Sequence, residues 1–354
     1  MKRLLLILVA LAVLLVACAT VTSTPDYEPR STSEFQDAFQ EPDPYPTYEA
    51  DETTESYEAL ELSKLFDSFD IGMQPLHRAL INSPFYINFI VIETISDIEN
   101  LRNISHVETL ALNFQFSGLE VIDLAVLEDF ENLELLYLSG MIYPFPIIYD
   151  ISILHALPNL TELSIRLFNI TYDDLTIIGS LTNLTGLNFN ANQINDITPL
   201  ANLTNLTSLS LSGNVLYDLT PLTNLTNLIA LDLGRTQISD ITALENLHNL
   251  TALDLVGNLI EDISPLSGLY NLIWLNIGST QFHEPNPVTD IAPLKELTNL
   301  RYVFLGGGFN RHYHHAGLNR YLMFNDDQMD ELIAALPNCN FDSFPQWVPI
   351  WIAR

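Results

Sequence analysis

The sequence predicts an α/β solenoid, in which short coils stack and together build one parallel sheet. Leu181, Leu203, Leu225, Leu247 and Leu269 each open a unit, and successive units start 22 residues apart. Within a unit, apolar residues alternate with small or polar residues over a short stretch, which indicates a strand with one buried face. A single unit cannot bury its leucines, whereas stacked copies share a continuous core. We therefore expect an arc with a concave parallel β-sheet, short helical turns on the convex side and helical caps at both ends.

Residues 1–17 have the pattern of a signal peptide. Lys2 and Arg3 precede 13 uncharged apolar residues, a run shorter than the roughly 18 residues that a membrane span needs. The segment closes on Leu15-Val16-Ala17-Cys18, which resembles the lipobox of bacterial lipoproteins. The resemblance implies that residues 1–17 are removed, that the Cys18 thiol is acylated, and that a membrane of the bacterial cell envelope holds the chain in an extracytoplasmic place. The alternative is an uncleaved anchor that contains a cysteine by chance.

Residues 18–58 are predicted to be the lipidated cysteine and a disordered acidic stalk. The region is rich in Pro, Thr, Glu and Tyr, and it shows neither a helical nor a strand period. Its acidic charges repel one another and extend the chain. Its prolines interrupt helices and sheet ladders alike, and they are Pro25, Pro29, Pro42, Pro44 and Pro46. The alternative is a motif of Tyr and Pro that a partner recognises.

The charge balance excludes two classes of partner. The chain has 44 Asp and Glu against 13 Lys and Arg, which gives a net charge of −31. Phosphates attract basic side chains, so nucleic acid is excluded as a partner, as is electrostatic adhesion to anionic lipid. The chain has 2 cysteines, which excludes a disulfide-rich scaffold.

The repeats occupy residues 83–305 and make about ten units. Each follows L-x-x-L-x-L-x-x-N-x-I, as in Leu184, Leu187, Phe189, Asn192 and Ile194, and several end in a sequence like D-I-T-P-L. This pattern resembles the leucine-rich repeat, and the 22-residue period resembles the internalin family of bacterial surface proteins. The resemblance implies adhesion or partner recognition. The units that open at Phe130 and Leu157 are longer and predict bulged loops, and the unit from Leu269 carries about six extra residues around FHEPNP.

Two polar positions recur within the units. Asn192, Asn214 and Asn258 follow the strand, where a buried amide can bond the backbone of the next coil. Thr236 and Thr280 replace that asparagine in two copies, which should weaken the bonding there. The pair Thr198-Pro199 predicts a helical turn with Thr as its cap. Recurrent aspartates suggest either calcium ligands or, as we prefer, backbone caps, and they are Asp97, Asp196, Asp218, Asp240, Asp262 and Asp290.

Both ends of the array need caps, because a bare repeat would expose its core. Residues 59–82 are predicted to be an N-terminal helical cap. Residues 306–354 should contain a His-rich loop, a cap helix from about Asp326 to Leu336 and a tail. The apolar stripe of that helix is predicted to be Leu332, Ile333 and Leu336. Cys339 should be buried as a small apolar residue.

No catalytic motif is present: the sequence has no G-x-S-x-G, P-loop, H-E-x-x-H or EF-hand loop. We therefore predict that the protein is not an enzyme and needs no cofactor. His312, His314 and His315 are the candidate metal ligands, because imidazoles bind zinc and similar ions. The alternative, which we prefer, is a solvated loop. Cys339 could also be a nucleophile, but we prefer a structural role for it.

The partner-binding residues are predicted on the hollow face of the sheet, between the buried leucines. Small polar side chains occupy the middle of this face, and aromatic side chains gather in its C-terminal third, where exposed rings would be interaction anchors. The alternative is that residues 309–324 or the Trp-rich tail cover the aromatic group. The candidates are Tyr137, Arg166, Asp232, Asp254, Trp274, Asn276, Tyr302 and Phe304.

These observations together predict a non-catalytic, lipid-anchored binding protein that recognises a protein or peptide through the concave sheet and acts as a monomer. The first alternative is a module that binds cell-envelope glycans, with Trp274, Tyr302 and Tyr137 as stacking platforms. The second is a metal-dependent enzyme that uses the His-rich loop. Fold alone does not decide among them.

Overall fold

The computed structural model describes residues 90–115, 117–140, 145–278, 286–305, 324 and 326–341. The chain divides into two compact units, Met1–Gly72 and Met73–Arg354, and the described residues all lie in the second. The predicted signal peptide, Cys18, the stalk, the N-terminal cap at 59–82, the three loop histidines and the tail from residue 342 lie outside the described residues. Within the described part, no helix has the length and apolar character needed to cross a membrane.

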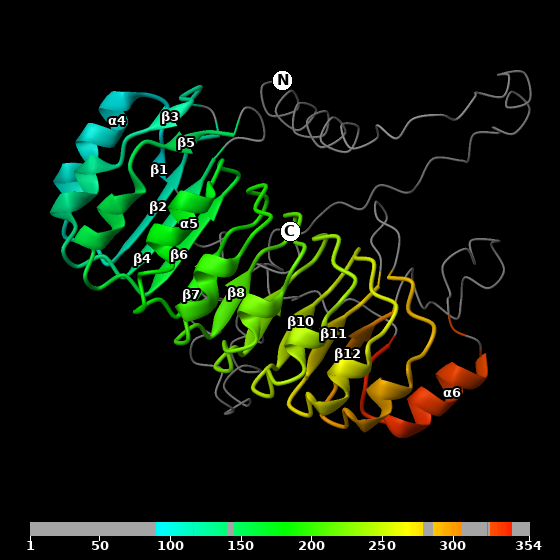
Figure 1. Ribbon diagram of the computed structural model, residues 1–354. Helices are drawn as coiled ribbons and strands as arrows, with labels where there is room; N and C mark the ends of the chain where they lie inside the picture. The colour runs from blue at the N-terminus through cyan, green and yellow to red at the C-terminus, as the bar shows by residue number, and fades with distance from the viewer. Residues whose placement is uncertain are drawn as a thin grey trace, which may run out of the picture. The chain divides into compact units, whose positions relative to one another are not determined.

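The described coils build one main sheet of ten parallel strands, which confirms the predicted solenoid (Figure 1). The strands follow one another in chain order except for two that pair elsewhere. Their bounds are β1 Ile90–Val91, β2 Thr109–Asn113, β4 Leu135–Ser139, β6 Glu162–Arg166, β7 Gly186–Asn188, β8 Ser208–Ser210, β9 Ala230–Asp232, β10 Ala252–Asp254, β11 Trp274–Asn276 and β12 Tyr302–Phe304.

A short helical segment links most strands to the next, and these segments lie along one side of the strands (Figure 1). Most are single 3-10 turns, because a coil of 22 residues leaves room for little more. The α-helices are α4 Ile95–Asn100, α5 Tyr172–Ile178 and α6 Asp326–Ala335. The 3-10 turns are η1 Leu101–Ile104, η2 Ala125–Asp129, η3 Ile151–Ala156, η4 Thr198–Asn202, η5 Thr220–Leu222, η6 Thr242–Leu244, η7 Ser264–Gly268 and η8 Ala292–Glu296.

An aspartate, and not the predicted threonine, caps each regular turn. In η4, Thr198 is the first residue of the turn, and its backbone N–H donates to Asp196 Oδ1 at 2.8 Å. In the same way, Asp218, Asp240, Asp262 and Asp290 each accept the backbone N–H of the residue two positions later. Hydrogen bonds from the side chain and backbone of Thr198 lower the pKa of Asp196. The prediction that these aspartates cap the backbone is confirmed, whereas the assignment of Thr198 as the cap is wrong.

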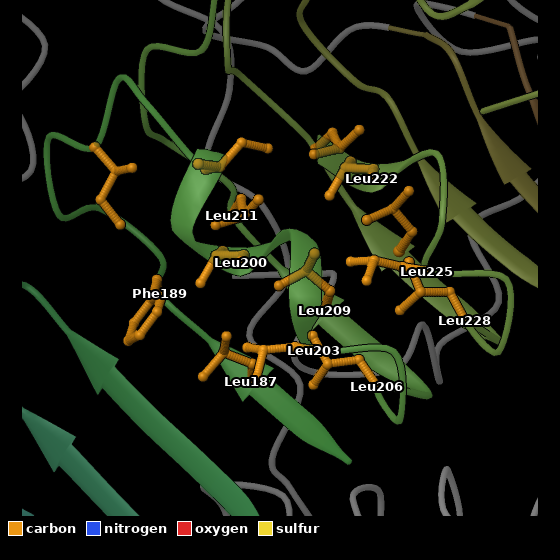
Figure 2. Close-up of a cluster of buried hydrophobic side chains, with 14 of the residues drawn as sticks. Leu187, Phe189, Leu200, Leu203, Leu206, Leu209, Leu211, Leu222, Leu225 and Leu228 are labelled. Atoms are coloured by element: carbon orange, nitrogen blue, oxygen red, sulfur yellow. The ribbon is translucent and has the colours of Figure 1, made fainter. Parts of the chain in front are cut away.

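The core is a continuous stack of leucines that runs from coil to coil. Figure 2 shows Leu187 and Leu209 from the strands packed with Leu200, Leu203 and Leu206 from the turns. Leu209 and its equivalents in the next strands are fully buried. Each coil therefore depends on its neighbours for burial of its apolar face, as expected for a solenoid.

Buried asparagines tie each coil to the next. Asn214 Oδ1 accepts the backbone N–H groups of Asn192 and Ile194 at 3.1 and 2.8 Å. Its Nδ2 donates to the carbonyl oxygens of Phe189 and Leu211 at 2.8 and 2.7 Å. One side chain thus satisfies four buried backbone groups. We call this series of asparagines the buried ladder.

Of the two copies predicted to depart from the buried ladder, only the copy with Thr236 does so. Thr236 keeps only a hydroxyl, which donates to Leu233 O at 2.7 Å, so it lacks the second donor that Asn214 has. The prediction that Thr280 also takes a ladder position is wrong, because Asn286 occupies it. Asn286 Nδ2 donates to Leu255 O and Ile277 O, both at 2.8 Å. A count of 22 residues from Asn258 assigns the ladder position to Thr280. Because this unit contains extra residues, Asn286 takes that position instead.

A second, exposed series of asparagines was not anticipated. In each case Nδ2 donates at 2.8 to 2.9 Å to a carbonyl oxygen of the preceding coil. Each of these asparagines is the third residue of the motif L-x-N-L, just before the leucine that precedes the strand. The motif therefore includes a residue that hydrogen-bonds the preceding coil. The members are Asn159, Asn205, Asn227, Asn249, Asn271 and Asn299.

The longer units contain additional structure where bulged loops were predicted. β3 (Val121–Ile122) and β5 (Ile147–Ile148) pair as a second, two-stranded parallel sheet. The unit that opens at Leu157 contains α5 in place of a 3-10 turn. Thr171 and Asp174 form a capping box at its start, with each side chain accepting the other residue's backbone N–H.

The C-terminal cap helix is confirmed as α6, with one change in its apolar stripe. Met329, Leu332 and Leu336 are buried, whereas the predicted Ile333 is half-buried. Residue 340 then pairs beside β12, since Asn340 N donates to Arg301 O and Val303 N donates to Asn340 O. Cys339 is half-buried and not fully buried as predicted, and burial raises the pKa of its thiol to about 12. The thiol is therefore protonated at neutral pH, which disfavours a role as a nucleophile.

Candidate functional site: the polar face of the sheet

The strand register gathers the predicted partner-binding residues on one face of the main sheet, opposite the leucine core. We call this the polar face. Its central row is Tyr137, Ser164, Asn188, Ser210, Asp232, Asp254, Asn276 and Phe304, which pair in register across β4 to β12. Trp274 and Tyr302 stand side by side in the row before it. Arg166 follows Ser164 by two residues in β6 and so projects to the same side.

The expectation that these side chains are open to solvent is wrong for half of them. Asp232, Asp254, Trp274 and Asn276 are 1, 2, 4 and 4% exposed. Tyr137, Arg166, Tyr302 and Phe304 are half-buried.

One physical reason is that the polar side chains of the central row lie flat along the sheet. Asp232 Oδ1 accepts the N–H of Gly234 at 2.9 Å, and Asp254 Oδ1 accepts the N–H of Val256 at 2.8 Å. Asn276 bends back to Gly278 in the same way. A side chain that bonds its own strand two residues on does not project from the face, and its neighbours on the adjoining strands shield it.

The centre of the polar face holds two buried carboxyl groups on adjacent strands. Burial raises the pKa of Asp232 to about 6, against the opposing effect of hydrogen bonds from Gly234 and Ser210. Burial and the neighbouring Asp232 raise the pKa of Asp254 well above its usual value. Like charges this close disfavour each other's ionisation, and burial adds to the effect.

Ser210 lies between two side-chain oxygens of the polar face. Ser210 Oγ lies 2.6 Å from Asn190 Oδ1 and 2.8 Å from Asp232 Oδ2. A hydroxyl has one hydrogen and can donate to only one of these oxygens. The hydrogen that Ser210 donates to Asp232 stabilises the carboxylate and so opposes the rise of its pKa.

Two arginines approach these carboxyls, and sequence reasoning identified only one of them. Arg166 and Arg235 are half-buried, and the Nε of each is buried without a hydrogen-bond partner. Arg235 sits in the turn after β9 with φ of 57°, where other copies have Ala191 at 57°, Gly213 at 72° and Gly257 at 65°. The signal that could have found it is this substitution of arginine into a column that also contains glycine.

The C-terminal end of the polar face is aromatic. The rings of Trp274 and Phe304 lie 6.1 Å apart between centroids, and Trp274 packs on Ala230 and Ala252. The indole Nε1 of Trp274 is buried without an acceptor. At the other end of the face, Tyr137 donates to Glu162 Oε2 at 3.0 Å, and burial followed by the charge of Glu162 raises the pKa of Tyr137.

Among the described residues, no three His, Cys, Asp or Glu side chains gather closely enough to hold a metal ion. The candidate ligands His312, His314 and His315 lie outside this part of the chain. The described aspartates that suggested calcium are instead engaged as backbone caps.

Comparison with known proteins assigns the fold family. Residues 204–246 and 226–271 match the family described as Leucine Rich repeats (2 copies). The solved structure of internalin C2 from Listeria monocytogenes is 33% identical, with 59% of this chain and 82% of that chain covered and a TM-score of 0.48. The chain belongs to the internalin-like leucine-rich-repeat proteins.

Two further structures are similar to this internalin-like chain. An internalin from Listeria monocytogenes, inlF, is 25% identical over 72% of this chain and 78% of its own, with a TM-score of 0.45. A leucine-rich-repeat protein of Leptospira interrogans is 20% identical over 69% of this chain and 57% of its own, with a TM-score of 0.52, and it shares the fold. No curated protein matches the sequence.

The internalin-like family gives this chain a general role. Leucine-rich-repeat domains of this kind serve protein–protein recognition and are generally binding modules without catalytic activity.

Proposed function

We propose that this protein is a non-catalytic, lipid-anchored and extracytoplasmic receptor that binds a protein or peptide partner through the polar face. The observation that carries the proposal is the strand register, which places all eight predicted partner residues on one side of the sheet. The opposite side is occupied by the leucine core and its turns, whose polar groups are engaged in capping. A monomer suffices, because the face is built by one chain.

The chemistry of the face supports recognition of a polypeptide. Arg166 and Arg235 are half-buried on this face, and the buried Nε atom of each has no acceptor. An unsatisfied buried donor costs about 1–3 kcal/mol, so a guanidinium that turns outward to a partner's acceptor would recover much of that energy. Backbone carbonyls and carboxylates of a polypeptide are such acceptors.

Site-specific crosslinking tests which side binds. A photoreactive phenylalanine in place of Asn188 or of Tyr302 stands on the polar face, and we expect it to form an adduct with a defined protein on intact cells. The same residue in place of Tyr217 or Tyr270 serves as the matched control, because these exposed tyrosines lie in turns outside the strands. Adducts are identified by mass spectrometry.

The distribution of adducts decides the outcome. A partner captured from positions 188 and 302 but not from 217 and 270 supports the polar face. Equal capture from all four positions, or capture from the turn positions alone, contradicts it.

The glycan alternative gains nothing from the described geometry. Sugar stacking needs an open ring face, whereas Trp274 is 4% exposed and the Tyr137 hydroxyl is already bonded to Glu162. No described feature favours the metal-dependent enzyme.

The anchor proposal rests on the lipobox-like sequence that ends at Cys18. Cys18→Ser should abolish incorporation of a palmitate label and move the protein from the membrane fraction to the soluble fraction, because the thiol is the acylated group. Cys339→Ser is the matched control, since Cys339 is half-buried in the C-terminal cap, and it should keep the label. Label in the Cys18→Ser protein, or none in the unaltered chain, would refute the anchor.

A further inference from the structure

Two arginines on the polar face have donors that nothing in the structure satisfies. Arg166 and Arg235 each keep a buried Nε without a hydrogen-bond partner, yet each residue as a whole is only half-buried. Part of each residue is therefore exposed on the face, while its Nε lies beneath the surface without an acceptor. Basic residues are scarce, with 13 Lys and Arg in the whole chain. Two arginines on one face therefore stand out against the acidic net charge of the protein.

The backbone places the two arginines on the same part of the face. Successive ladder bonds from Leu167 to Asn190, from Ala191 to Ser212 and from Gly213 to Gly234 link β6 to the turn after β9. Three strand spacings, roughly 14 Å, separate Arg166 from Gly234, the residue before Arg235. Short side chains occupy the interval, and both arginines lie close enough to Asp232 to act on its charge.

Arg235 holds its place against the local preference of the backbone. Its φ of 57° is left-handed, a conformation that glycine adopts freely and arginine does not. The same copy also carries Thr236, which lacks the second donor of the buried ladder. Left-handed backbone recurs at this position of the coils, with Ala191 at 57° and Leu167 at 59°, so the conformation belongs to the repeat. What distinguishes this copy is the long basic side chain beside the buried carboxyl of Asp232.

We infer that Arg166 and Arg235 together receive a side-chain carboxylate, an Asp or Glu, from an extended segment of the protein partner. This inference rests on the proposed function of the polar face. A guanidinium edge and a carboxylate match in a bidentate geometry. A single negative charge fits better than a phosphate, because Asp232 and Asp254 stand close by. A side chain fits better than a chain terminus, because the sheet continues on both sides of the pair, from β4 on one side to β12 on the other.

A random peptide display library, selected against the full chain, provides the probe. Selection should enrich peptides with Asp or Glu at one position. One enriched peptide is then compared with its Glu→Gln or Asp→Asn analogue by binding titration. The amide should bind the unaltered protein about 10- to 100-fold more weakly.

The protein variants locate the effect. With Arg235→Gly or Arg166→Gln, the difference between acid and amide peptides should shrink to about 3-fold or less. Arg235→Gly also restores the residue of the neighbouring copies, so it should raise the Tm, which separates lost binding from lost folding. Arg102→Gln is the control for removal of a positive charge, because Arg102 pairs with Asp129 far from the polar face, and it should leave the discrimination unchanged.

Each other outcome counts against the inference. Enriched peptides whose discrimination survives both arginine variants would overturn the carboxylate site and leave the polar face standing. A requirement for a free peptide C-terminus would overturn the side-chain source, and enriched sequences that match this chain itself would make the occupant a copy or segment of the same protein. A selection that enriches nothing overturns both the inference and the proposed function.

Discussion

Asn214→Ala is expected to lower the free energy of unfolding by about 3–5 kcal/mol. The substitution removes the acceptor of the Asn192 and Ile194 N–H groups and the donor to the Phe189 and Leu211 carbonyls. All four backbone groups belong to a buried stretch where the side chain is 1% exposed. Urea denaturation followed by circular dichroism measures the effect.

Thr236→Asn is the matched substitution in the opposite direction. It would place a ladder asparagine where one donor is missing, and we expect a gain of about 1 kcal/mol. A loss below 1 kcal/mol for Asn214→Ala would contradict the view that the buried ladder is a main support of the stacked coils.

Asp232→Asn is expected to stabilise the protein at pH 7.5 by about 2–3 kcal/mol and to have little effect near pH 4. The folded-state pKa of Asp232 is raised to about 6. The folded state therefore binds more protons than the unfolded state between the unfolded pKa near 4 and pH 6, so stability falls as pH rises through this window. An amide removes the cost of the buried charge and can still accept from Gly234 and donate to Ser210.

Thermal denaturation from pH 4 to pH 8 tests whether stability falls as pH rises, as predicted. The unaltered protein should lose stability between about pH 4 and pH 6.5, and Asp232→Asn should flatten that slope. The neighbouring Asp254, also raised, acts in the same direction, while Arg166 and Arg235 oppose the shift of Asp232. An equal slope in the variant and the unaltered protein would show that Asp232 titrates normally.

The capping aspartates determine how stability changes with pH on the acidic side of the pH profile. The pKa values of Asp196, Asp218, Asp240 and Asp262 are lowered by hydrogen bonds to the turns. Their contribution is present above the ordinary carboxyl pKa and is lost as pH falls through the lowered values. The two groups of carboxyls therefore predict a stability maximum in mildly acidic solution.

Periodicity was sufficient to predict the fold. The 22-residue spacing and the alternation around Leu187 correctly predicted parallel strands, the side on which the leucines pack and the cap at α6. The buried ladder and the capping aspartates were also predictable, because each role recurs at one position of the repeat. Such roles depend on local backbone geometry, which identical spacing reproduces.

Departures from the repeat were less predictable. Alternation places Asp232 on the polar face but does not reveal that its carboxyl bonds Gly234 and lies flat. Arg235 lies in a turn, outside the alternating rows, so a pattern based on strands does not reach it. Asn286 replaces Thr280 in the buried ladder because an insertion shifts the register, and the path of an insertion depends on the three-dimensional fit to the previous coil.

The uniform coil length between Leu181 and Gly268 has a genetic consequence. A duplication or deletion of one 22-residue segment in this stretch would rejoin strand to strand and ladder asparagine to ladder residue, because every bond between coils links positions a fixed number of residues apart. Such a change would therefore lengthen or shorten the array by one whole unit. Variants of different length would inherit an intact core while the spacing between Arg166 and the aromatic end of the polar face changed in steps of one strand.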